Sequence, residues 1–199
     1  MTKVDDGLAR FFALSDGIFA VIITIMVLAF KPPIGRDFPA LMSLWPDLLS
    51  YAVSYAFVAV VWLNHHAVLR HAQRLTATLA LANFANLFAI SFIPFTTAWL
   101  AETELASFPL TFYALVFLLV QGTYMVLMRE SYSHVRTSGD DAKARNWQWV
   151  RAWIMLAVFL VAAVVIVIPS FLRLALLASF LILYCRPDPF LRTRSSQHN

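Results

Sequence analysis

Apolar runs of bilayer-spanning length recur along this chain of 199 residues. A helix needs about 20 apolar residues to cross roughly 30 Å of hydrocarbon. Six runs approach or reach this length, at residues 11–30, 48–69, 78–100, 109–128, 147–168 and, shorter than the rest, 171–185. A helix satisfies its backbone hydrogen bonds within one segment, as lipid requires. The sequence therefore predicts an all-α polytopic membrane protein with six transmembrane helices in a single domain over residues 1–199.

Composition supports a lipid environment. Hydrophobic residues make up 61% of the chain and charged residues 13%, against about 45–50% and about 25% in a soluble domain. We therefore expect the chain to be embedded in a lipid bilayer. The net charge of +4 is not gathered like a nucleic-acid-binding patch, and we expect no nucleic-acid partner. The single cysteine, Cys185, excludes an internal disulfide framework and a CxxC metal site.

The basic residues predict the orientation. If the N-terminus lies in the cytoplasm, twelve of the 15 Lys and Arg residues fall on the cytoplasmic side. Only Lys31, Arg36 and Arg173 fall outside, where acidic residues are frequent. Because Lys and Arg favour cytoplasmic loops, and because six spans return the chain to its starting side, we predict that both termini are cytoplasmic.

The most unusual stretch is residues 10–20, because Asp16 lies about one turn inside the first apolar run. An ionised carboxylate at this depth costs on the order of several kcal/mol unless it is paired, so such residues face protein or water. Two roles are open for Asp16. It either ties helices together through hydrogen bonds or a cation, or it handles ions or protons directly.

Helical geometry separates two faces of the first span. At 100° per residue, Val21, Ile25 and Leu28 fall within about 60° of one another, with Thr24 beside them. Asp16 lies roughly 140° from this stripe. On an axis shared by several subunits, the stripe would form apolar rings of the type that gate ion flow by dewetting. A lipid-facing helix or one packed in a core has the same periodicity, so both interpretations stay open.

Histidines cluster at the end of the second span, in Trp62-Leu63-Asn64-His65-His66 and at His71. None of their spacings is the i, i+3 or i, i+4 of metal ligands on one helix face, so we predict no metal site. We expect one histidine to donate a hydrogen bond to Asp16 or Ser15. No GxSxG, P-loop or other catalytic motif is present, and the sequence predicts no enzyme and no cofactor.

These residues resemble a known family. Arg10-x-x-x-Leu14-Ser15-Asp16 is similar to the Arg-x-x-x-Phe-Ser-Asp signature of the transmembrane protein 175 potassium-channel family, with Leu in place of the motif's Phe. The family comprises the endolysosomal potassium channel and its bacterial relatives. Residues 62–66, Asn83 and the pair at 94–95 resemble it too. The specific motifs lie only in the first three spans.

The resemblance implies a prokaryotic member in the bacterial inner (plasma) membrane. It implies a four-fold homotetramer of six-helix subunits, with the first helices lining the pore and no P-loop selectivity filter of the TVGYG type. Potassium ions are the implied permeant species.

The resemblance also implies roles for individual residues. The pore constriction, a hydrophobic gate, would be Val21 with Ile25 and Leu28, and Thr24 would supply the hydroxyl associated with potassium preference. Val21 stands where a longer Ile or Leu is usual, so we expect a wider or leakier constriction. The implied structural polar network consists of Arg10, Ser15, Asp16, Trp62, Asn64, His65 and His66.

We therefore predict a potassium-permeable cation channel with an apolar constriction on its first span. The alternative is a proton-coupled membrane transporter that uses Asp16 and His65 or His66 as relay groups. A third interpretation, a membrane-bound metal or haem redox subunit, requires histidine pairs on facing helices. Only His134 and His198 lie outside the cluster, and both are in polar segments.

Overall fold

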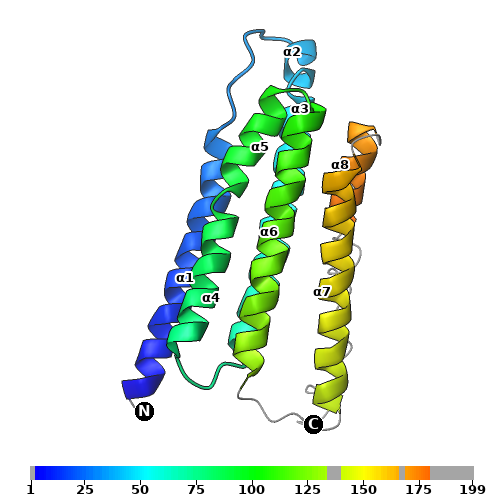
Figure 1. Cartoon of the computed structure of the whole chain (residues 1–199). Coiled ribbons are helices and arrows are strands. Elements are labelled where there is room, and N and C mark those ends of the chain that lie inside the picture. Colours follow the sequence, from blue (N-terminus) through cyan, green and yellow to red (C-terminus); the bar gives the residue numbers. More distant parts are fainter. Residues whose placement is uncertain (1–2, 134–139, 166–168, 180–199) are drawn as a thin grey trace, which may run out of the picture.

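The computed structural model describes residues 3–133, 140–165 and 169–179. Within these ranges every regular element is a helix (Figure 1). The helices are α1 (Lys3–Leu28), α2 (Phe38–Met42), α3 (Trp45–Leu69), α4 (Ala77–Ile90), α5 (Ile93–Glu102), α6 (Ser107–Tyr132), α7 (Asp140–Val164) and α8 (Ser170–Ala178). The prediction of an all-α protein is confirmed.

Five helical stretches in the described part are long and apolar enough to cross a membrane. They are Gly7–Leu28, Trp45–Leu69, Ala77–Glu102, Ser107–Tyr132 and Arg145–Val164, and they correspond to the first five predicted spans. Helix α8 covers the start of the sixth. Residues 180–185 of that span, and residues 166–168 of the fifth, lie outside the described ranges.

The third predicted span is two helices. α4 ends at Ile90 and α5 begins at Ile93, with Ser91 and Phe92 forming a turn between them. Pro94, in the first turn of α5, has no N–H, so the carbonyl of Ile90 loses its usual helical donor. A proline inside a helix is expected to kink it. Here α4 and α5 are separate helices, joined through the turn by backbone hydrogen bonds from Phe92 to Ala89 and from Thr96 to Phe92.

A short helix that the apolar pattern did not predict lies in the loop after α1. The side chain of Asp37 accepts a hydrogen bond of 3.0 Å from the backbone N–H of Ala40 and so caps α2. Pro39 occupies the first turn, where a missing N–H costs nothing. The Asp-x-Pro sequence is the signal that was available for this helix.

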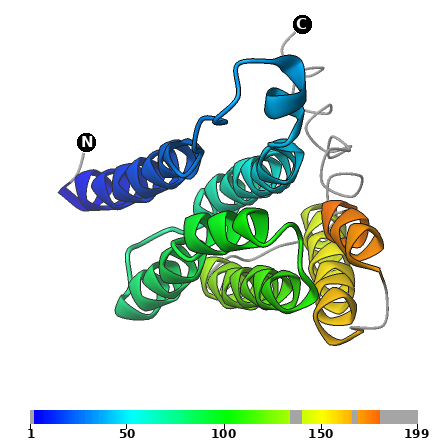
Figure 2. The same ribbon diagram turned by 90° about the horizontal axis from the view of Figure 1, so that it is seen from above.

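The long helices stand side by side, and α1 lies at the edge of the array in both views (Figures 1 and 2). It packs against α3, α4 and α5, while α6 lies between α4 and α7, and α8 packs on α7. Rings fill the centre of the bundle. Phe57 and Phe117 stack with centroids 3.6 Å apart, and Phe159 meets both edge-on. This interior is therefore a packed core and not a channel.

The two ends of the bundle differ in charge. The start of α1, the α3–α4 turn and the end of α6 lie at one end, and α2 and the α5–α6 turn lie at the other (Figure 1). The first end contains Arg10, Arg70, Arg74 and Arg129 against Asp5, Asp6 and Glu130, and the second contains Asp37, Asp47, Glu102 and Glu104 against Lys31 and Arg36. The bundle thus has a basic end and an acidic end.

Candidate pore-lining helix

Helix α1 has one face in the bundle and one face outside it. The buried face consists of Phe11, Ser15, Phe19, Ile22 and Met26. The stripe of Val21, Ile25 and Leu28 points away from the bundle, with 54%, 46% and 79% of these residues exposed. Only 28% of the α1 span is buried, the smallest share among the five spans. The single chain therefore leaves an apolar helix face largely exposed.

Thr24 lies next to this stripe and is exposed. Its Oγ1 is 2.9 Å from the carbonyl oxygen of Val21 and 3.1 Å from that of Ala20. A carbonyl only accepts, so the hydroxyl proton of Thr24 points back at the helix. The lone pairs of the Thr24 hydroxyl oxygen therefore remain free to coordinate a cation outside the chain.

A groove runs between α1 and the α4–α5 break. It has a volume of about 750 Å³. Its walls are almost wholly apolar and include Leu14, Gly17, Val21 and Ile25 from α1 and Ser91, Pro94 and Phe95 from the other side. The break between α4 and α5 and the stripe residues Val21 and Ile25 thus line the same groove.

Ser15 connects α1 to α4 and α3. Nδ2 of Asn83 donates to Oγ of Ser15 over 2.9 Å, and Oδ1 of Asn83 is 2.6 Å from Nε2 of His65. Because Oδ1 only accepts, Nε2 of His65 carries the proton. The Ser15 hydroxyl donates in turn to the carbonyl of Phe11, over 3.3 Å. Ser15, Asn83 and His65 are all buried, so this chain of hydrogen bonds satisfies groups that would otherwise cost free energy.

Asp16 connects α1 to α3 by a separate contact. Nε1 of Trp62 donates to Oδ1 of Asp16 over 2.8 Å. We expected a histidine to bind Asp16 or Ser15 directly, and this expectation was wrong. Trp62 binds Asp16, Asn83 binds Ser15, and His65 reaches Ser15 only through Asn83.

Three further residues of the implied network lie elsewhere. Asn64 donates to the carbonyl of Val60 in its own helix. His66 accepts from the guanidinium of Arg70 over 2.8 Å, with its ring 5.9 Å from that of Trp62. Arg10 is exposed and takes no part in the hydrogen bonds of Ser15 or Asp16. The bridging residue, Asn83, was not part of the implied network, although it is one of the residues that resemble the family.

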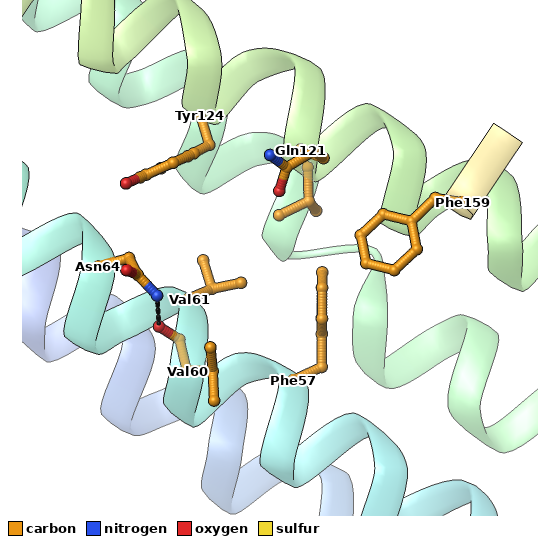
Figure 3. A pocket seen from close by; sticks show the side chains of 8 residues that line it. Phe57, Val60, Val61, Asn64, Gln121, Tyr124 and Phe159 are labelled. Atoms are coloured by element: carbon orange, nitrogen blue, oxygen red, sulfur yellow. Dashed lines mark hydrogen bonds between the residues drawn. The ribbon is translucent and has the colours of Figure 1, made fainter. Parts of the chain in front are cut away.

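Asn64 faces a small pocket on the other side of α3 (Figure 3). Asn64, Gln121 and Tyr124 form its polar part, and Phe57 and Phe159 lie toward its apolar end. The free volume is about 20 Å³, room for about one water molecule. The pocket is lined by α3, α6 and α7 and has no wall from α1.

The segment that follows α1 is tied to α5 by an ion pair. Nζ of Lys31 is 2.7 Å from Oε1 of Glu102, with 81% and 58% of the side chains exposed. The hydrogen bond and the charge of Glu102 raise the pKa of Lys31 above its ordinary value. Surface pairs of this kind contribute little, since water screens them.

In the part of the chain that the structure describes, no three His, Cys, Asp or Glu side chains come together to hold a metal ion. His134 and His198, which a redox subunit would need, lie outside the described ranges.

The fold and the two-faced first helix define a multi-pass helical membrane protein. A family model described as endosomal/lysosomal potassium channel TMEM175 matches residues 10–94. A Chryseobacterium protein (strain P1-3) named a potassium channel is 31% identical over 137 residues, which is 69% of this chain and 70% of the relative. The chain therefore belongs to the TMEM175 family, whose members are ion channels and not enzymes and need no cofactor.

A solved structure and a vertebrate relative extend the comparison. The crystal structure of a lysosomal potassium-selective channel TMEM175 homolog from Chamaesiphon minutus matches with a TM-score of 0.77 and 26% identity, covering 90% of this chain and 97% of that one. A mouse protein named endosomal/lysosomal proton channel TMEM175 is 29% identical over 94 residues, or 41% of this chain and 19% of the relative.

Proposed function

We propose that this protein is a potassium-permeable cation channel whose path is lined by α1 helices from several copies of the chain. One observation carries the proposal. The buried face of α1 is held by polar contacts to α3 and α4, while its apolar stripe is left exposed. One helix cannot surround an ion path, so the stripe lines a path only in an oligomer.

The oligomer that we propose is a homotetramer. Four α1 helices around a common axis would place Val21, Ile25 and Leu28 in three stacked rings. Rings of this type exclude water when they are narrow and so gate ion flow. The small Val21 side chain would make the innermost constriction a leaky one.

The names of the bacterial relatives point to potassium as the permeant ion. The Chryseobacterium relative is named a potassium channel and the Chamaesiphon homolog a potassium-selective one. Thr24 supports the same choice, because its lone pairs are free to meet a partly dehydrated cation at the stripe.

We further propose that the chain resides in a bacterial inner membrane with both termini in the cytoplasm. The basic end of the bundle contains the start of α1 and the acidic end contains α2. Basic loops remain on the cytoplasmic side during insertion.

The test compares two valines of α1. Val21 lies on the stripe and Val27, which is equally apolar and 48% exposed, lies about 120° away around the helix. We expect Val21→Ala to raise potassium flux in liposomes about tenfold or more, since a dewetted constriction is exponentially sensitive to its width. Val27→Ala should leave the flux unchanged. Equal flux from both variants and the parent protein would show that Val21 is not at the constriction.

The same liposomes test the alternative of a proton-coupled transporter. The name of the mouse relative gives a reason to measure protons. Asp16 and His65 both lie in contacts between helices and off the stripe, which disfavours a relay. We expect bi-ionic reversal potentials to follow potassium. Proton-driven flux that saturates, and that disappears in folded Asp16→Asn, would favour the transporter.

A further inference from the structure

Three buried hydroxyl groups meet where α3, α5 and α6 come together. Oγ of Ser54 is 2.7 Å from Oγ1 of Thr97 and 2.7 Å from the hydroxyl oxygen of Tyr113. Ser54 and Tyr113 are completely inaccessible, and Thr97 is only 5% exposed. A buried hydroxyl is costly unless it is bonded, so these three depend on one another.

The chain of hydroxyls has one direction. Oγ1 of Thr97 lies 2.7 Å from the carbonyl oxygen of Ile93, which can only accept. The proton of Thr97 therefore goes to Ile93, and its oxygen accepts the proton of Ser54. The oxygen of Ser54 is then free to accept from Tyr113. The order Tyr113, Ser54, Thr97, Ile93 satisfies every proton.

This chain ends at the first turn of α5, directly after the helix break. The backbone hydrogen bonds are sparse there: Phe92 donates to the carbonyl of Ala89 and Thr96 to that of Phe92, but Pro94 has no N–H to donate to the carbonyl of Ile90. The backbone therefore fixes the direction of α5 less firmly than a continuous helix would. The next two residues, Pro94 and Phe95, form the wall of the groove opposite Val21 and Ile25. Side-chain contacts from α3 and α6 must therefore orient this wall.

We propose that Ser54 is a positioning residue for the constriction. It acts through Thr97, holding the first turn of α5 so that Pro94 and Phe95 confine Val21 and Ile25 of α1. Ser54 touches no ion and lies on a different helix from the stripe. The inference rests on the proposed function insofar as α1 lines the ion path.

The chain offers a matched control on the same helix. Ser50 lies one turn before Ser54 and is also completely inaccessible. Its hydroxyl has no hydrogen-bond partner among the residues that the structure describes. Ser50→Ala therefore removes the same atom as Ser54→Ala without breaking a contact. Tyr113→Phe is a second test variant, since its ring keeps its packing on Phe117, 4.4 Å away.

The functional experiment is single-channel recording in potassium with protein shown by gel filtration to be folded. We expect Ser54→Ala and Tyr113→Phe each to raise the open probability about fivefold, the population shift that one lost buried hydrogen bond produces. The reason is that a looser wall lets Val21 and Ile25 withdraw into the groove. Ser50→Ala should behave like the parent protein. Parental open probability in folded Ser54→Ala and Tyr113→Phe, or an equal rise in Ser50→Ala, would overturn the proposal.

A second readout does not depend on conduction. A spin label is attached at Ser91→Cys in a Cys185→Ser background, because Ser91 is exposed and lies in the break. The electron paramagnetic resonance line should show a more mobile label in Ser54→Ala and Tyr113→Phe but not in Ser50→Ala. If the label responds while the parent protein carries no potassium current, the positioning stands and the proposed function fails. An unresponsive label overturns the positioning whatever the current.

Discussion

Ser15 and Asp16 are neighbours in the sequence, yet they bind different helices. They point about 100° apart on α1, so Ser15 meets Asn83 of α4 and Asp16 meets Trp62 of α3. Two adjacent polar residues thus fix α1 both in rotation and in position. The cost of placing them in an apolar helix is offset because each has a partner.

Asn83 is the residue whose loss we expect to cost most in this contact. Asn83→Leu leaves the N–H of His65 without an acceptor and removes the donor to Ser15. Each buried group left unpaired costs about 1–3 kcal/mol. The thermal unfolding midpoint in detergent should fall clearly, whereas Ser91→Ala, at an exposed hydroxyl on the α4–α5 turn, should change it little. Similar midpoints for both variants would contradict the role of Asn83.

We expect the contact of Asp16 with Trp62 to depend on the acceptor oxygen more than on the charge. Asp16→Asn keeps an oxygen for the indole N–H of Trp62, so we expect little change in stability. Asp16→Leu removes the acceptor and should cost about 1–3 kcal/mol. Unfolding of both variants in one detergent measures the difference. If Asp16→Asn is as damaging as Asp16→Leu, the charge itself is needed.

For individual residues, the sequence predicted the two faces of α1 but not which residues of the other helices α1 would contact. Helical spacing alone places Asp16 away from the stripe, and in the structure Asp16 contacts Trp62 of α3 while the stripe is exposed. The pore role of the stripe stays a prediction. Asn64 and His65 show what could not be predicted. They are adjacent, but only His65 reaches the network. Which of them does so depends on how α3 is rotated against α1, and local spacing does not encode that rotation.

Among the helices, α8 is attached by a buried arginine. Arg173 is completely inaccessible and donates to the carbonyl of Ala162 over 2.9 Å and to Oγ1 of Thr111 over 2.7 Å. A weaker contact of 3.4 Å reaches the carbonyl of Ser107. One side chain thus joins α8 to α7 and α6. The hydropathy pattern marked Arg173 only as a charge near the start of a short span.

The guanidinium group of Arg173, which donates to two helices at once, leads to a prediction about how firmly α8 is attached. Arg173→Lys keeps the charge but offers a single nitrogen, which cannot reach partners on two helices in the same way. We expect Arg173→Lys to lower stability by about 1–3 kcal/mol. Limited proteolysis and thermal unfolding measure the loss. An Arg173→Lys protein as stable as the parent would mean that one of the two helix contacts suffices.

The sequence predicted where the spans lie, but it did not predict whether each span is one continuous helix. Five predicted spans correspond to membrane-length stretches because lipid imposes a length that the apolar runs must meet. A proline inside a span is expected to kink it, but how far the helix is interrupted depends on contacts with other helices. Ser54 of α3 meets Thr97 of α5 there, over 2.7 Å. Hydropathy does not report such contacts.

For the molecule as a whole, the ion pair of Lys31 with Glu102 predicts that stability depends on pH. Because Glu102 raises the pKa of Lys31 above its ordinary value, the pair stabilises the folded state at neutral pH. Its contribution is lost as pH rises through that raised pKa. We expect Lys31→Met to lower the unfolding temperature slightly at neutral pH and low salt, and the difference to vanish at strongly alkaline pH or high salt. A difference that grows with pH would contradict the pair.

The assembly is tested by asking which face of the chain meets its own copy. Around a shared axis, each α1 stripe approaches the stripe of its neighbours, so identical positions come close. Leu28→Cys in a Cys185→Ser background should therefore form disulfide-linked dimers on mild oxidation in native membranes. Val164→Cys on α7 is a matched control, since Val164 is also apolar and 66% exposed. It should not cross-link, because the bundle lies between α7 and the axis.

The pattern of cross-linking separates assembly from random collision. Collision in the membrane would join both cysteines at rates set by exposure alone, and Val164 and Leu28 are both well exposed. A central pore joins only Leu28→Cys, and native mass spectrometry of that sample should show four chains. Cross-linking at Val164→Cys alone would place α7 at the contact between copies. The exposed stripe of α1 would then face lipid, and the ion path would have to be sought on another helix.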